Sequence, residues 1–117
     1  MRLNLDCIRD ILLAADEELT LHKNMEFYHG IKYESLKDYS FDELHFHALQ
    51  CSMSGLIIIK RYVDGGFSIR DITPEGYTFL DKVRSNKMWN TVKTSLKKLG
   101  AFSLKSIIDA VLTTLIP

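Results

Sequence analysis

Residues 40–75 constrain the fold more than any other part of the chain. Ser40 and Glu43 have the spacing of a capping box, in which the serine caps a helix and the glutamate returns the hydrogen bond. Gly55 suits the position just after a helix end, because glycine adopts left-handed backbone without strain. The sequence therefore predicts a helix over residues 41–54.

A β-hairpin is predicted directly after this helix. The β-branched run 56–63 favours a strand, Asp64-Gly65-Gly66 favours a tight turn, and residues 67–72 can return as the second strand. A capped helix that ends in Gly-Leu-Ile and runs straight into a hairpin over residues 56–72 is the arrangement of a winged helix. The helix 41–54 would then be the recognition-type helix, and the glycine turn the tip of the wing.

Helices are also predicted on both sides of this unit. Asn4 can cap a helix over residues 5–18, whose acidic end predicts basic partners nearby. Thr73 and Pro74 can open a helical segment over residues 74–99, which Ser85-Asn86 can interrupt. The last helix is predicted over residues 103–115. Its apolar face is the cleanest in the chain and consists of Leu104, Ile107, Ile108, Val111, Leu112 and Leu115.

Residues 20–39 carry weaker signals. Residues 20–22 and 27–33 favour extended chain, and Lys23-Asn24 can form a turn between them, so one or two short strands are expected. Together the elements predict a single α+β domain over residues 1–117, a winged helix-turn-helix-like fold with a β-hairpin wing and additional C-terminal helices.

The charge of the chain is balanced overall but not along its length. Its 15 basic and 15 acidic residues give a net charge of zero, which disfavours a general nucleic-acid-coating protein. Residues 1–59 hold 5 basic against 10 acidic residues, and residues 60–117 hold 10 against 5. The halves therefore carry −5 and +5, and such a separation can steer a charged partner.

The composition also bears on compartment. Cys7 and Cys51 lie in apolar-periodic stretches without a CxxC motif, which is typical of reduced cytosolic thiols. No signal-peptide pattern is evident, and apolar runs such as Leu56–Ile59 fall far short of the roughly 20 residues that span a bilayer. We expect a cytoplasmic protein that does not engage a membrane.

Few residues suggest catalysis. His47 and Cys51 are four residues apart on one helix face, a spacing that can chelate a metal, but no further pair has matching spacing. A packed or hydrogen-bonded histidine is the simpler interpretation. No glycine-rich phosphate loop is present, and the adjacent acids read as solvated faces or caps. We therefore expect no enzyme activity, no metal and no cofactor.

The basic second half suggests a surface for nucleic acid or an acidic protein. The simpler interpretation is a solvated helix face. The hairpin and the helix after it offer cations for phosphates, and the helix 41–54 offers only two polar groups for base edges. Trp89 could stack on a base, but its spacing to Val92 and Leu96 places it in the core. The candidate nucleic-acid-binding residues are Lys60, Arg61, Arg70, His45, Gln50, Lys93 and Lys97.

The acidic first half predicts a different partner. Its carboxylates could imitate nucleic-acid charge and occupy a basic groove on a host protein. The candidate protein-binding residues are Glu34, Asp38, Asp42 and Glu43. The apolar face of the last helix must also be covered, either by the rest of the chain or by a second copy in a homodimer.

Several motifs resemble one family. They are Phe46-His47, Gly55-Leu56-Ile57, the run Ile72–Asp81 with Arg84 and Trp89, and the opening Met1–Leu13. They resemble a family of small uncharacterised proteins carried by phages, prophages and mobile elements, a domain of unknown function. The resemblance implies a winged-helix fold and a phage or bacterial origin, and it implies no enzyme activity.

Two functions follow as expectations. The first is a non-catalytic, phage-type winged-helix binding protein, a regulator of transcription or an adaptor, with DNA as its partner. The alternative is a protein-binding inhibitor or anti-defence factor of a phage or mobile element, whose acidic surface occupies a host target. Both keep the fold and differ in the partner.

Overall fold

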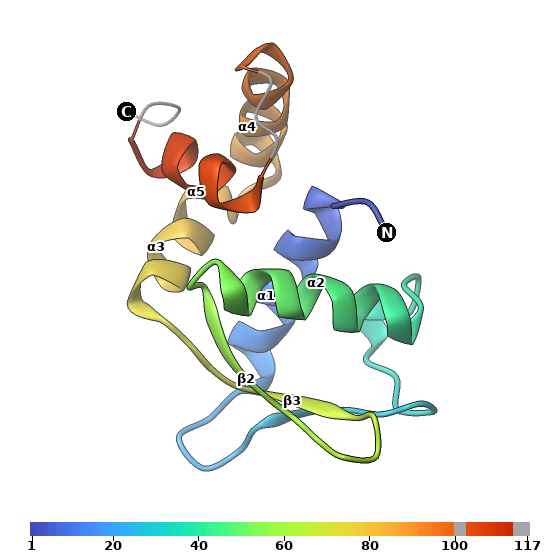
Figure 1. Ribbon diagram of the computed structural model, residues 1–117. Coiled ribbons are helices and arrows are strands. Elements are labelled where there is room, and N and C mark those ends of the chain that lie inside the picture. Colours follow the sequence, from blue (N-terminus) through green and yellow to red (C-terminus); the bar gives the residue numbers. More distant parts are fainter. Residues whose placement is uncertain (100–102, 114–117) are drawn as a thin grey trace.

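The computed structural model describes residues 1–99 and 103–113 (Figure 1). Within these residues the chain forms an α+β fold, as the sequence predicted. The elements in chain order are α1 (Leu5–Glu18), β1 (Met25–Phe27), the short 3₁₀-helix η1 (Glu34–Leu36), α2 (Phe41–Met53), β2 (Ile57–Arg61), β3 (Phe67–Ile72), α3 (Pro74–Val83), α4 (Asn86–Leu99) and α5 (Leu104–Thr113).

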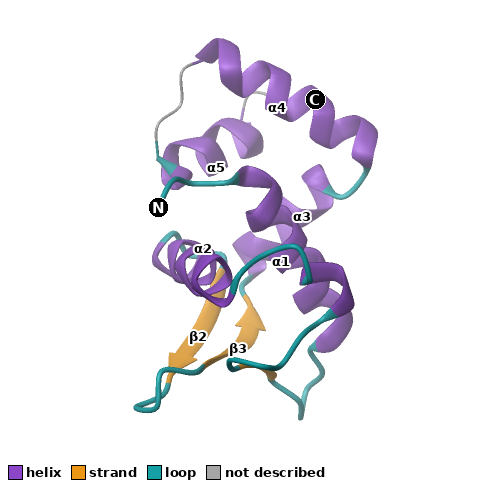
Figure 2. Ribbon diagram, turned by 90° about the vertical axis from the view of Figure 1, so that its right-hand side faces the viewer, coloured by secondary structure: helices purple, strands orange, loops and turns teal. Residues whose placement is uncertain are grey.

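The three strands form one antiparallel sheet in the order β1-β3-β2. The register pairs Phe67 of β3 with both Phe27 of β1 and Arg61 of β2, and it slips by one residue between Ile58 and Ile59. Helices α1 and α2 lie over the sheet, while α4 and α5 lie at the end of the molecule away from the hairpin (Figures 1 and 2). The core sits between these layers and includes Ile8, Leu12, Met25, Phe67, Ile69 and Phe79.

The predicted helix caps are confirmed. The Asn4 side chain accepts from the backbone at the start of α1, and the Thr73 hydroxyl accepts from Gly76 N at 3.0 Å at the start of α3. Ser40 and Glu43 exchange both hydrogen bonds of the capping box, each at 3.1 Å. These groups satisfy backbone donors that a helix start leaves without a partner. Their positions were readable because capping depends on neighbours in the sequence.

The region before α2 differs from its prediction. The strand that forms is Met25–Phe27, earlier and shorter than the extended run expected at residues 27–33. Thr20 and Lys23 form an isolated bridge around a tight turn. The three-residue strand exists because it can pair with β3, 40 or more residues away, and no local pattern reports that pairing.

The segment predicted over residues 74–99 consists of two helices with a break at residues 84–85. Ser85 caps the second helix, since its hydroxyl accepts from Met88 N at 3.1 Å. Arg9 of α1 closes the first helix, because its guanidinium donates to the carbonyl of Val83 at 2.7 Å. The interruption that Ser85-Asn86 suggested is therefore confirmed.

The acidic end of α1 has the basic partners that its sequence predicted. Asp16 forms an ion pair with Arg84 at 3.0 Å, and Glu18 forms one with Lys23 at 3.4 Å. Arg84 follows the end of α3, so the first of these pairs also joins two parts of the chain that are far apart in sequence. Both pairs are partly exposed, and their contribution to stability is small.

The apolar face of α5 is covered within a single chain. Leu104, Ile107, Ile108 and Val111 are buried, and Leu112 is half-buried. The helix begins at Leu104 and ends at Thr113, and Leu115 lies outside the described residues. The sequence left open whether the chain itself or a second copy covers this face. For the described residues, the chain itself covers it. Among those residues, no helix has both the length and the apolar character needed to cross a membrane.

Gly76 provides a test of the packing between α3 and the hairpin. A Cβ at this position would overlap the carbonyl oxygen of Leu56 and lie 2.8 Å from Ile72 Cγ2. Glycine to alanine within a helix ordinarily stabilises by about 0.5–1 kcal/mol. Here the overlap reverses the sign, and we expect Gly76→Ala to lower the free energy of unfolding by about 1–3 kcal/mol in urea denaturation.

The matched control is Thr78→Ala on the exposed side of the same helix. It is expected to change the free energy of unfolding by less than about 0.5 kcal/mol. A Gly76→Ala variant as stable as the wild type would contradict the close approach of the two backbones.

Candidate binding surfaces

The hairpin of β2 and β3 is held by a tight turn. Tyr62 N donates to Gly66 O at 2.8 Å, and the Asp64 carboxylate accepts from Gly66 N at 3.0 Å. Gly65 has a φ of +94°, in the left-handed region that glycine adopts without strain. The residues expected at the tip of the wing therefore do form the turn.

Three exposed cations lie on this hairpin. Lys60 and Arg61 are on β2, and Arg70 is on β3. Arg70 falls at the slip in register, where neither Ile58 nor Ile59 pairs with it, and such bulges change the direction of a side chain. Within residues 1–99 and 103–113, none of the three cations forms an ion pair. The three cations predicted to contact phosphates are therefore exposed to solvent on the hairpin.

The two residues predicted to read bases are placed differently. The His45 ring stacks on Phe67 with centroids 4.5 Å apart, and its Nε2 is buried without a hydrogen-bond partner among the described residues. Burial, together with the charge of Arg61, lowers the pKa of His45, so the ring is neutral near pH 7. Gln50 is half-buried on α2. Of the two, His45 therefore packs as part of an aromatic cluster.

The four acidic candidates do not act as one surface. Glu34 forms an ion pair with Lys37 at 2.8 Å, and Glu43 belongs to the capping box of α2. Asp38 and Asp42 are exposed, and neither forms an ion pair with a described residue. Two of the four predicted acidic residues therefore already have partners within the chain.

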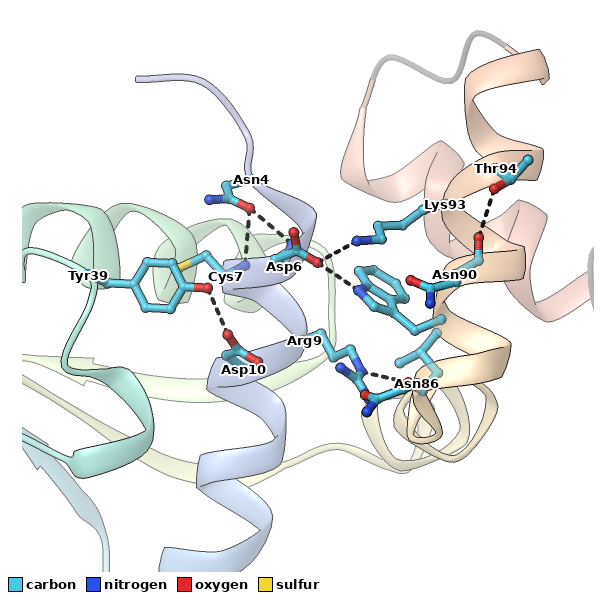
Figure 3. Close-up of polar contacts among 12 residues, drawn as sticks. Asn4, Asp6, Cys7, Arg9, Asp10, Tyr39, Asn86, Asn90, Lys93 and Thr94 are labelled. Atoms are coloured by element: carbon cyan, nitrogen blue, oxygen red, sulfur yellow. Dashed lines mark hydrogen bonds and ion pairs between the residues drawn. The ribbon is translucent and has the colours of Figure 1, made fainter.

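The two α4 candidates also have different roles. Lys93 forms an ion pair with Asp6 of α1 at 3.0 Å (Figure 3). It also lies 5.6 Å from the centroid of the Trp89 ring. Trp89 is buried, as its spacing predicted, and its indole N–H donates to the same Asp6 carboxylate at 2.7 Å. Lys97 is exposed in the last turn. Lys93 therefore joins α4 to α1.

His47 and Cys51, whose spacing on one helix face could chelate a metal, are both buried. His47 is buried; Asn4 N donates to its Nε2 at 2.8 Å, and its Nδ1 lies 2.7 Å from the Glu43 carbonyl. This network assigns the proton to Nδ1. Burial raises the pKa of the Cys7 thiol to about 12 and also raises that of Cys51, so both remain protonated near neutral pH. Protonated, buried thiols are poor nucleophiles and metal ligands.

Two hollows lie near the end of the sheet. One, of about 210 Å³, is formed by the chain between β1 and α2 and has aromatic walls that include Phe27, Tyr33, Tyr39 and Phe41. The other, of about 200 Å³, is shallow and lies where the outer side of α2 meets β2; its lining is Asp42, His45, Phe46, Leu49 and Arg61.

Sequence reasoning missed the outer side of α2. Phe46, Leu49 and Met53 lie there together with Asp42, opposite the buried residues Leu44, Ala48 and Cys51. The spacing of i, i+4, i+7 and i+11 was readable in the sequence, but it did not say that this side faces solvent.

Comparison with known proteins gives the family of the chain. The chain belongs to the family described as "Hypothetical protein (DUF2513)", which matches residues 2–103. The match includes α1, the sheet and α2, and it confirms the expectation of a family of unknown function. Searches of the curated proteins and of the solved structures found no match.

The contact of Asp6 with α4 predicts a dependence of stability on pH. The hydrogen bond from Trp89 lowers the pKa of Asp6 below 3.8; burial opposes this shift, and Lys93 supports it. A lowered pKa in the folded state stabilises the fold above the unfolded pKa, and this stabilisation is lost as the pH falls through the folded pKa. The difference in unfolding free energy between wild type and Asp6→Asn should therefore shrink between about pH 7 and about pH 3 in urea denaturation.

Asp38→Asn is the matched control, because Asp38 is exposed and forms no ion pair or hydrogen bond with a described residue. Its difference from the wild type should stay near zero at each pH. A constant difference for Asp6→Asn across the range would show that the Asp6 charge does not stabilise the junction.

Proposed function

We propose that the chain is a non-catalytic binding protein of winged-helix type, which contacts the phosphates of DNA through its hairpin. The observation that carries this proposal is the set of three exposed cations on the hairpin, Lys60, Arg61 and Arg70, which form no ion pair with a described residue. Phosphate contacts by such cations supply most of the affinity of non-specific DNA binding.

The topology supports the winged-helix part of the proposal. Helix α2 leads through Gly55 directly into β2, and β3 lies between β1 and β2 in the sheet. The short helix η1 precedes α2 where a helix-turn-helix unit has its first helix. This order of α1, β1, η1, α2 and a two-stranded hairpin is the order expected of a winged helix, and it supports the proposal.

The surface of α2 supports contact with phosphates more than reading of bases. Its outer side offers Phe46, Leu49 and Met53, and the buried Nε2 of His45 cannot reach a base edge without rearrangement. Phosphate contacts position a protein on DNA, whereas base contacts specify the sequence. We therefore expect binding with little sequence preference from α2.

The resemblance of the motifs to phage- and prophage-borne proteins supports a role as a regulator or adaptor of a mobile element. The alternative, an inhibitor that imitates nucleic acid with its acidic half, has less support. Of the four acidic candidates only Asp38 and Asp42 are exposed without an ion pair to a described residue, and they are two charges at most.

The test is the salt dependence of binding to a random-sequence duplex. If each chain contacts three phosphates, the affinity should fall by at least about 40-fold between about 50 and about 200 mM salt. Replacing Lys60, Arg61 and Arg70 by Glu should abolish binding at the lower salt concentration. Fluorescence anisotropy of a labelled duplex measures both effects.

A second triple variant controls for net charge. Lys87, Lys98 and Lys105 are exposed on α4 and α5, and replacing them by Glu makes the same change in charge away from the hairpin. This variant should lose much less affinity than the hairpin variant. No binding by the wild type at low salt, or an equal loss in the two variants, would refute the proposal.

A further inference from the structure

The outer side of α2 is an apolar stripe with no described element over it. Asp42, Phe46, Leu49 and Met53 follow one another along this side, and Met53 is 66% exposed. Figures 1 and 2 agree that α2 is an outermost element, with α1 and the sheet on its inner side. Phe46 and Leu49 are half-buried and Met53 is exposed, so this side of the helix carries a contiguous, partly exposed apolar surface. Such a surface is unfavourable in water and marks an interaction site.

Arg61 of the hairpin lies at the edge of this stripe. Arg61 of β2 closes the hollow of about 200 Å³ beside Asp42, Phe46 and Leu49. Among the described residues, neither Asp42 nor Arg61 forms an ion pair or a hydrogen bond with another side chain. The surface thus carries one open acid and one open cation, with apolar side chains between them.

This combination is self-complementary. In an interface with two-fold symmetry the same patch meets itself, so residue i of one copy contacts residue j of the other, and j contacts i. Asp42 of each copy can then pair with Arg61 of the other while Phe46, Leu49 and Met53 pack together. Asp42 would repel nucleic-acid phosphates, whereas in the two-fold pairing it meets a cation.

We propose that two copies of this chain pair through the stripe of Asp42, Phe46, Leu49 and Met53, with Arg61 at its edge. The pairing covers the outer side of α2 and leaves the exposed Lys60 and Arg70 of both hairpins outside the stripe. It replaces the dimer through the last helix, whose described apolar residues are covered within one chain. The pairing itself does not rest on the DNA-binding proposal, and it is measured without DNA.

The small size of this surface points to weak association between the two copies. A standard interface buries about 800 Å² per partner, and one helix side with the edge of a hairpin is smaller. We therefore expect a dissociation constant in the micromolar range. Sedimentation equilibrium of the whole chain, over concentrations from about 5 to about 500 µM, should show the mass rising from 13.5 kDa towards twice that value.

The first variant breaks the apolar contact. Leu49→Lys places two like charges at the centre of the pairing, so its mass should stay at 13.5 kDa. Leu21→Lys makes the identical substitution at a residue that is 94% exposed in the turn after α1, and this control should associate like the wild type. Circular dichroism checks that both variants are folded.

The second set of variants tests the charge pair, and it decides the question even if Leu49→Lys does not fold. Asp42→Arg and Arg61→Asp should each weaken association by about tenfold, and the double variant should restore it to within about threefold of the wild type. Restoration by the swap is the result expected if the two side chains meet across the interface, and within one copy they form no ion pair. A double variant that associates no better than the single variants would contradict this contact.

Three results would overturn the proposal. One is a mass of 13.5 kDa at every concentration. The second is a dimer that neither Leu49→Lys nor the charge variants weaken. The third is a monomer in which Leu49→Lys changes the affinity for duplex DNA, since the stripe would then face nucleic acid. A dimer that fails to bind DNA would refute only the contact of the hairpin with phosphates.

Discussion

The fold depends on the contact between Arg9 of α1 and the end of α3. The Arg9 guanidinium donates to the carbonyls of Val83 and Arg84 and, at 3.0 Å, to the side chain of Asn86. The last carbonyls of a helix lack partners within it, and a cation there also complements the helix dipole. This contact fixes the turn between α3 and α4, and that turn brings Trp89 onto Asp6. Helix α1 thereby joins the sheet and α2 on one side to the C-terminal helices on the other.

The opposite charges of the two halves of the sequence serve this junction. The acidic residues Asp6 and Asp16 lie on α1, and their partners Lys93 and Arg84 come from the basic half. Part of the separation into −5 and +5 is therefore neutralised when the chain folds. The cations of the hairpin are not neutralised in this way by any described residue. Charge asymmetry in a sequence thus has two consequences here, an internal junction and an exposed surface, and only the structure separates them.

The parts of the fold that could be predicted are those set by near neighbours. The caps at Asn4, Ser40 and Thr73 and the turn at Gly65 depend on residues within a few positions, and the sequence located all four. The strand β1 and the Arg9 contact depend on partners 40 or more residues away, so no local pattern reported them. For the candidate site, the spacing of the outer residues of α2 was readable. Which of the two apolar sides of α2 would be covered depends on how α1 and the sheet pack against it.

Helix α2 is apolar on both sides, and this limits what its outer side can do. Its inner side packs through Leu44, Ala48 and Cys51, so rotation of the helix cannot hide the outer stripe. A groove-reading helix needs donors and cations on its outer side, and here that side holds Asp42 and three apolar residues. Covering the stripe with a second copy removes the apolar surface from water and takes Asp42 away from DNA phosphates. Pairing through α2 takes up Arg61 and leaves Lys60 and Arg70 exposed on each hairpin, so it is compatible with phosphate contact through those two cations.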